Sequence, residues 1–143
     1  MADPLDTGSD PGISAAEEEA RLAELHDLGI LDTAAEPEFD DLVDTASRIA
    51  GKPIALMTLL DEDRQWFKAR KGLDATGTPR DVAFCNRAIQ NPGEPLIVED
   101  ARTDPRFSDN PLVTGDPHVA FYAGMPIVTS EGHALGTICV IDR

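Results

Sequence analysis

Hydrophobic residues recur at helical spacing in two segments of the first third of the chain. Ser14 is placed to cap the first helix, whose opening turns are acidic, and Gly29 is placed to end it. A second apolar stripe begins at Phe39 and stops before Gly51. The pattern therefore predicts two amphipathic helices, whose apolar positions are Leu22, Leu25 and Leu28 in the first and Phe39, Leu42, Val43, Ala46, Ile49 and Ala50 in the second.

The pattern changes after Pro53 from helical spacing to short apolar runs. Residues 54–60 are almost all apolar and predict a buried strand, although periodicity alone does not exclude a helix. Residues 65–70 alternate and predict the returning strand of a hairpin. Residues 72–79 are rich in Gly, Thr and Pro and predict a loop.

The second half of the chain continues with short elements around one long polar segment. A short helix is expected over residues 81–90 and a brief strand over 96–98. Residues 100–116 form a polar connection, and a connection of this length is more often functional than idle. Residues 121–129 and 134–141 predict a closing hairpin. The expected fold class is α+β, a mainly antiparallel sheet with helices packed on it.

Composition and charge narrow the classes of partner. The chain has 143 residues, 41% of them hydrophobic, which suits one domain with its own core, and its net charge is −15. A surface of that sign repels phosphate backbones and anionic lipids, so neither nucleic acid nor a membrane is an expected partner. The sequence contains neither a membrane-spanning apolar stretch nor a secretory signal. We expect a cytoplasmic protein with reduced cysteines, in which residues 1–14 form a flexible acidic leader and 15–143 form the domain.

A collinear set of short segments resembles the GAF domains of bacterial signalling proteins. The resemblance begins near Glu17, runs to Arg143, and is specific because the segments occur together and in order. They are Gly29–Thr33, Glu36–Asp40, Pro53–Leu56, Asp63–Lys68, Arg80–Cys85, Asp100–Phe107, Asn110–Val113, Phe121–Pro126 and Leu135–Asp142.

The resemblance implies a six-stranded antiparallel sheet with helices on both faces. One face carries the helices near the chain ends, which often pair two subunits, and this implies a homodimer through the N-terminal helices. The other face is the usual ligand pocket. Such domains regulate outputs such as histidine kinases of two-component systems or nucleotide cyclases. This sequence stops at Asp142-Arg143, where family members continue into a last helix, so we expect the closing helix to be missing.

The two cysteines support different interpretations. Cys85 lies near the start of the predicted third helix, where a helix N-terminus favours the thiolate, as in a redox sensor. Bilin-carrying relatives place a His beside the anchoring Cys, whereas Asn86 follows here, so a chromophore anchor is disfavoured. The favoured interpretation of Cys85 is a small buried side chain, and Cys139 is expected in the core.

The expected ligand site combines the long connection with the strand that the fold places beneath it. Polar groups above an apolar floor are what a small-molecule cleft requires, and an Arg there can hold a phosphate or carboxylate. The alternative is that Asp100, Arg102 and Asp104 pair with one another and with the loop backbone. The candidate ligand-binding residues are Phe84, Cys85, Asp100, Arg102, Arg106, Phe107, Asn110, Tyr122 and Gly124.

Three functional hypotheses follow. The first is a sensor that binds an unidentified small molecule and regulates an attached output module. The second is a dimerisation module without a ligand, and the third is a free methionine sulfoxide reductase using Cys85 with Cys139 as its resolving partner. No two histidines stand at metal-ligand spacing, so neither a metal site nor catalytic residues are expected, and the residues identify no cofactor. We expect the chain not to be an enzyme, with any catalysis residing in an output domain.

Overall fold

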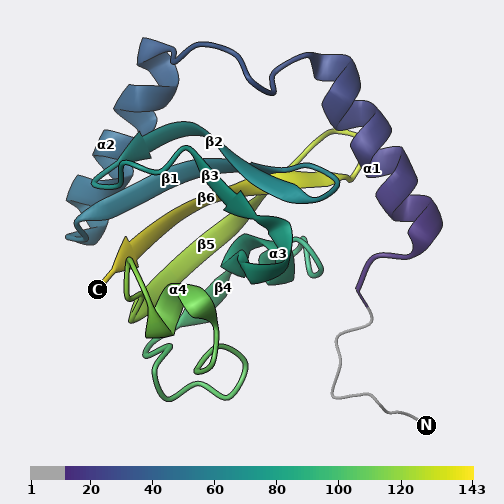
Figure 1. Ribbon diagram of the computed structural model, residues 1–143. Helices are drawn as coiled ribbons and strands as arrows, with labels where there is room; N and C mark the ends of the chain where they lie inside the picture. The colour runs from purple at the N-terminus through teal and green to yellow at the C-terminus, as the bar shows by residue number, and fades with distance from the viewer. Residues whose placement is uncertain (1–11) are drawn as a thin grey trace, which may run out of the picture.

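The computed structural model describes residues 12–143, and its first two helices occupy the predicted segments (Figure 1). Helix α1 spans Ala15–Leu28 and helix α2 spans Pro37–Ala50. Ser14 caps α1 by accepting a hydrogen bond from the Glu17 amide, and the Glu17 carboxylate accepts one from the Ser14 amide. Both helices end at the predicted glycines, which adopt the left-handed conformation that closes a helix.

The predicted leader falls largely outside the described residues, which exclude residues 1–11. Its last part contacts the domain: Ile13 packs against the main core, and its amide donates a hydrogen bond to Gln90 Oε1 at 2.9 Å. Within residues 12–143, no helix combines the length and hydropathy needed to span a membrane.

The predicted six-stranded antiparallel sheet is confirmed, in the order β3-β2-β1-β6-β5-β4. Strands β1 and β2 form one hairpin, and β5 and β6 form another. The two hairpins are joined in the sheet by the pairing of β1 with β6. The strands are β1 (Ile54–Leu60), β2 (Arg64–Lys71), β3 (Gly77–Pro79), β4 (Leu96–Val98), β5 (Phe121–Val128) and β6 (Ala134–Asp142).

The predicted loop over residues 72–79 and helix over 81–90 are wrong in detail. The loop contains β3, in which Gly77 pairs with Trp66 so closely that a Cβ atom at Gly77 would lie 2.4 Å from the Gln65 carbonyl oxygen. Gly and Pro, which indicated a loop, are tolerated here because β3 is an edge strand. The helix divides into a 3-10 turn, η1 (Arg80–Val82), and a shorter α3 (Phe84–Ala88).

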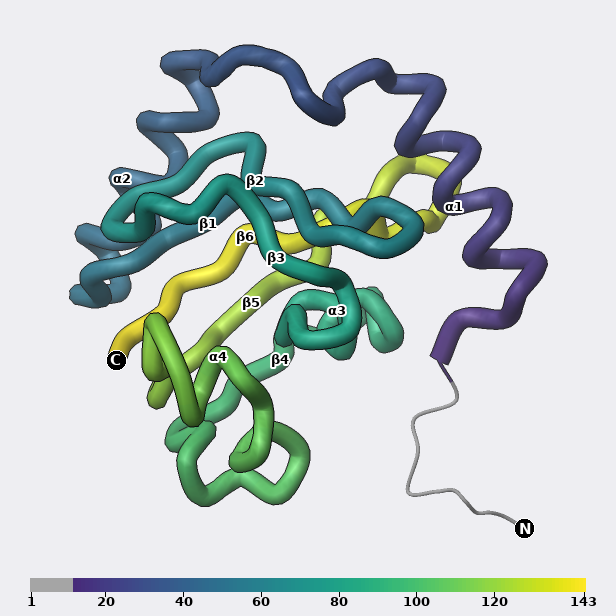
Figure 2. The backbone as a smooth tube through the Cα atoms, in the orientation of Figure 1, coloured from purple at the N-terminus to yellow at the C-terminus, as the bar shows by residue number. Residues whose placement is uncertain are grey.

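The helices cover opposite faces of the sheet, as Figures 1 and 2 show. Helices α1 and α2 lie on one face, where Val43 packs on Ala55 and Met57 of β1, and Leu25 packs on Leu59. Helix α3 and α4 (Pro111–Thr114) lie on the other face over the largest core cluster. All seven residues of β1 are buried because both faces of this strand are covered, which explains its continuous apolar run.

Candidate functional site

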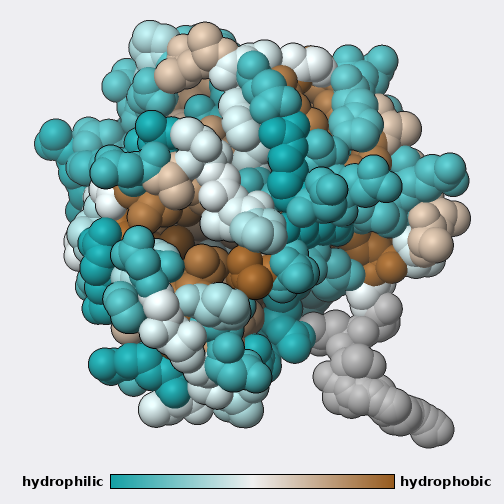
Figure 3. Space-filling view, viewed as in Figure 1, coloured by the Kyte–Doolittle hydropathy of each residue, from teal (hydrophilic) through white to brown (hydrophobic). Residues whose placement is uncertain are grey.

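A cavity of about 240 Å³ lies between the sheet and the α3–α4 side of the domain. Figure 3 shows apolar side chains gathered in a hollow on the face turned to the viewer. The lining is contributed by β1, β2, β3, α3, α4, β5, β6 and the connections around them. Its residues are Leu56, Gln65, Phe67, Leu73, Ala75, Gly77, Thr78, Pro79, Phe84, Cys85, Leu112, Asp116, Pro117, Val119, Tyr122, Cys139 and Ile141.

Three of the predicted ligand-binding residues meet in the lining of this cavity. The rings of Phe84 and Tyr122 lie 5.2 Å apart and are tilted by 42°. The Tyr122 hydroxyl and the Cys85 sulfur share a hydrogen bond of 3.1 Å. Gly124, two residues along β5, leaves room for this ring, because a Cβ atom there would lie 2.2 Å from the Tyr122 hydroxyl oxygen. The structure therefore places Gly124 beneath Tyr122 as a spacer.

The two thiols form a buried polar cluster in the cavity lining. Cys85 also contacts the Thr137 hydroxyl at 3.0 Å, and both cysteines are free. Burial raises the pKa of the Cys85 thiol, but hydrogen bonds with Cys139, Thr137 and Tyr122 outweigh burial and lower the pKa to about 7. A hydrogen bond with Cys85, together with burial, raises the pKa of the Cys139 thiol. The predicted burial of both cysteines is confirmed.

Gln65 is a lining residue that the sequence patterns did not single out. Its side chain is buried, and Nε2 donates a hydrogen bond to the Thr78 hydroxyl at 3.1 Å. Its Oε1 has no hydrogen-bond partner, and no other buried side-chain N or O atom among residues 12–143 is left in this state. The alternation of β2 contained the signal, since Gln65 shares a face with the buried Phe67.

The predicted residues of the long connection lie outside the cavity lining. Arg102 is exposed and is held by Asp100 through its backbone amide and its guanidinium group. Arg106 is held by Asp104 in the same way. These contacts are the mutual pairing that the sequence offered as the alternative to ligand binding.

Phe107 and Asn110 lie outside the cavity lining, and each contacts a residue that belongs to it. Phe107 stacks on Phe84 with ring centroids 4.1 Å apart and the planes 9° from parallel. The Asn110 side chain donates to the Val82 carbonyl at 3.0 Å and accepts from the Leu112 amide at 2.8 Å. It thereby caps α4 and joins the connection to η1.

A part-buried ionic network joins α1 to the elements beside the cavity. Arg80 of η1 donates to Asn86 of α3 at 2.8 Å and forms an ion pair with Glu18 of α1. Glu18 also pairs with the buried Arg21, which reaches the carbonyls of Ala134 and Leu135. Burial raises the pKa of Glu18, but the hydrogen bonds from Arg80 and Arg21 outweigh burial, and the pKa falls to about 2.

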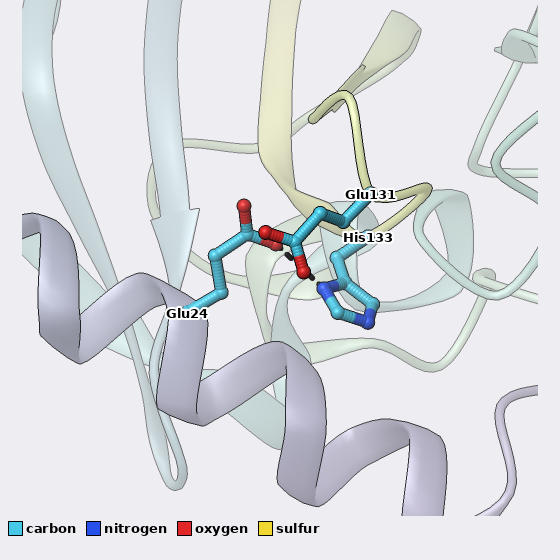
Figure 4. Close-up of side chains that lie close together, drawn as sticks. All are labelled: Glu24, Glu131 and His133. Carbon is cyan, nitrogen blue, oxygen red and sulfur yellow. Dashed lines mark hydrogen bonds and ion pairs between the residues drawn. The ribbon is translucent and has the colours of Figure 1, made fainter.

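A second polar cluster fixes α1 to the turn between β5 and β6. His133 Nδ1 lies 2.6 Å from Glu24 Oε1, and the Thr129 hydroxyl donates to the same oxygen at 2.9 Å. Figure 4 shows Glu131 beside this pair, and one ligand atom from each of Glu24, Glu131 and His133 lies within 4.8 Å of the others. The sequence pattern did not indicate this grouping, because it contains a single histidine and because Glu24 is far from the turn in the sequence. The hydrogen bonds of Glu24 with Thr129 and His133 account for the positions of these three residues as a contact between helix and turn.

Comparison with proteins of known sequence finds a relative that is similar over most of this chain. The chain is 46% identical over 127 residues to a cyclic di-GMP phosphodiesterase of Pseudomonas aeruginosa. The match covers 89% of this chain and 22% of that protein, so the chain spans about a fifth of the length of its relative.

Solved structures confirm the fold. The GAF domain of an Acinetobacter phosphoenolpyruvate-protein phosphotransferase superposes with a TM-score of 0.57 at 18% identity, covering 92% of this chain and 79% of that one. A type II free methionine-R-sulfoxide reductase from Thermoplasma acidophilum superposes with a TM-score of 0.56 at 12% identity, covering 88% and 77%.

These comparisons contradict the expectation that the chain is not an enzyme. The relative that is 46% identical to this chain over 127 residues is named as an enzyme, and a methionine sulfoxide reductase has this same fold. The expectation was wrong because the lack of a recognisable catalytic motif in one domain does not exclude an enzyme. The family itself is shown by the GAF domain model, which matches residues 29–143. The chain belongs to the GAF domain family.

Proposed function

We propose that this GAF domain is a signalling sensor that binds a small molecule in the cavity lined by Phe84, Cys85 and Tyr122. The observation that carries the proposal is the position of the cavity, whose lining comes from both the sheet and α3. A ligand there touches both layers at once, so its binding energy can alter how α3 packs on the sheet. Apolar walls with few polar groups are typical of small-molecule sites.

The ionic network supplies a route from this cavity to the N-terminal helix. Arg80 directly follows Pro79 of the cavity lining and holds both Asn86 of α3 and Glu18 of α1. A displacement of α3 on ligand binding therefore changes the contacts that position α1. The sensor proposal requires such a connection, because a signal has to leave the ligand site.

We propose that the output regulated by this domain is a cyclic di-GMP phosphodiesterase in the cytoplasm. The support is the relative of that name, which is 46% identical over most of this chain and is much longer. This relative favours cyclic-nucleotide signalling over a two-component histidine kinase. Two free cysteines buried beside each other fit a reducing compartment.

Dimerisation is a second candidate role, and one observation favours it. Helices α1 and α2 expose large apolar side chains, with Ile49 83%, Leu28 58% and Leu42 42% exposed. A homodimer through these helices would cover them. Light scattering should then give the mass of two chains for the wild type and of one chain for Ile49→Glu. A single-chain mass for the wild type would remove this role.

Native mass spectrometry of the purified protein, compared with its mass after denaturation, tests the sensor proposal. We expect a non-covalent adduct that denaturation removes, or one that forms when cell extract metabolites are added. Leu112→Trp, which enlarges a half-buried lining residue, should abolish the adduct. Ile97→Trp on the exposed edge strand is the control and should keep it. An adduct unaffected by Leu112→Trp, or no adduct under either condition, would contradict the proposal.

A further inference from the structure

The cavity lining offers no positively charged side chain to a ligand within the described part of the chain. Among residues 12–143 it includes no Lys, Arg or His, and its one carboxylate, Asp116, is exposed. The guanidinium groups of Arg102 and Arg106 lie on the long connection and are held by aspartates. An anionic ligand would enter this cavity without a cation to receive it, and desolvation of an unpaired charge is unfavourable. The lining therefore selects against phosphates and carboxylates.

The volume of the cavity limits the ligand to about one ring. A cavity of about 150 Å³ in another protein holds benzene. The 240 Å³ available here has room for one aromatic ring with small substituents. Phe84 and Tyr122 offer aromatic surfaces to such a ring. A cyclic dinucleotide, with its two purines, two riboses and two phosphates, exceeds this space and carries the wrong charge.

One polar group in the lining lacks a partner. Gln65 is 5% exposed and its Nε2 is already bonded to Thr78, whereas its buried Oε1 has no hydrogen bond. Buried acceptors are almost always satisfied in folded proteins, because an unmet hydrogen bond is costly. Among the other polar side chains of the lining, Cys85 and Tyr122 share a hydrogen bond, Thr78 accepts from Gln65, and Asp116 is exposed to solvent. Gln65 Oε1 is thus the buried acceptor available to a donor on a ligand.

We propose that this cavity binds an uncharged, largely apolar molecule of about one aromatic ring, whose hydroxyl or N–H group donates a hydrogen bond to Gln65 Oε1. The inference rests on the proposed sensor function and specifies its ligand class. It also implies that the ligand sensed here differs from cyclic di-GMP, the molecule in the relative's name.

Three probes of similar size test the ligand class on the wild-type protein. Phenol carries a ring and a donor, toluene has nearly the same shape without the donor, and benzoate carries a negative charge. Titrations followed by NMR should give saturable binding of phenol, about tenfold weaker binding of toluene, and none of benzoate. Equal affinities for phenol and toluene would overturn the role of Gln65. Saturable benzoate binding, or displacement of phenol by cyclic di-GMP, would overturn the ligand class.

Two variants test whether the preference for phenol depends on Gln65. Gln65→Leu removes Oε1, and phenol should then bind no better than toluene. Gln90→Leu makes the same substitution at a part-buried glutamine outside the lining and should keep the preference for phenol. Loss of the preference in both variants would assign it to a general effect on the domain and contradict the inference. Urea unfolding curves identify a variant that has lost its fold, and the wild-type probe series stands without either variant.

Failure of this inference is distinguishable from failure of the sensor proposal. If no probe binds but native mass spectrometry finds a retained molecule that Leu112→Trp abolishes, the ligand class is wrong and the sensor proposal stands. If no probe binds and no molecule is retained, both are wrong.

Discussion

The face of the sheet under α1 and α2 contains buried charges, whereas the face under α3 and α4 contains an apolar cavity. Lys68 on the first face is fully buried and bonds to Thr33, to the Ala34 carbonyl and to Glu36. On the second face, Gln65 keeps an acceptor without a partner. The buried polar side chain under α2 is thus fully bonded, whereas one acceptor in the apolar cavity is left without a partner. We therefore propose that the first face is scaffold and that the second carries the ligand site.

The scaffold face should show the largest effect on stability. Lys68→Met keeps most of the side-chain volume but removes the ammonium group, which leaves Glu36 and the Ala34 carbonyl without their donor. We expect a loss of about 2–4 kcal/mol in the free energy of unfolding, measured in urea. Lys71→Met is the matched control, since Lys71 forms a part-exposed pair with Asp44, and it should cost less than about 1 kcal/mol. Equal losses in the two variants would contradict the particular importance of the buried Lys68 ammonium group.

On the cavity face, we expect stability to fall when a substitution adds atoms to the tightly packed residues beside the cavity. Gly124→Ala places a Cβ atom against the Tyr122 hydroxyl and forces the ring to move toward the cavity. We expect a loss of about 1–3 kcal/mol in the free energy of unfolding, together with weaker phenol binding. Tyr122→Leu provides the control, because it removes both the hydroxyl and the ring carbons that the new methyl group would meet. Gly124→Ala should therefore cost less in the Tyr122→Leu background, and an unchanged cost would contradict this explanation.

The ionic network between the faces should show the smallest effect, seen as a dependence on pH. The folded-state pKa of Glu18, about 2, lies below its ordinary value of 4.5. The carboxylate therefore contributes stability that is fully present above pH 4.5 and is lost as the pH falls toward 2. Because Glu18 is partly exposed, solvent screening keeps this contribution to about 1 kcal/mol or less. Across this range Glu18→Gln should lose less stability than the wild type, and parallel pH profiles would contradict the role of Glu18.

The hydrophobic pattern correctly predicted the elements that bury a regular or continuous set of apolar side chains. The stripe ending at Gly51 and the apolar run over residues 54–60 became α2 and β1, since each buries a continuous set of side chains. The pattern missed β3, an edge strand of three residues whose stability comes from pairing with β2. Local sequence does not encode such a partner.

The candidate site was predictable only in part. Phe84, Cys85 and Tyr122 were proposed through the family resemblance, and they meet in the cavity lining. Gln65 was not proposed, because a glutamine in an alternating strand is usually solvent-facing, and its burial depends on a contact with Thr78 thirteen residues away. The arginines of the long connection drew attention as charges, but their pairing with nearby aspartates depends on the loop geometry.

Our central inference is that a ligand binds on the face under α3 and α4 and not on the face under α1 and α2. Intermolecular nuclear Overhauser effects between phenol and the protein test it directly. We predict effects to the side chains of Phe84, Tyr122 and Leu56, which line the cavity. Effects to Leu25 and Val43, which lie under α1 and α2, or no effects to the cavity lining at saturating phenol, would contradict the claim.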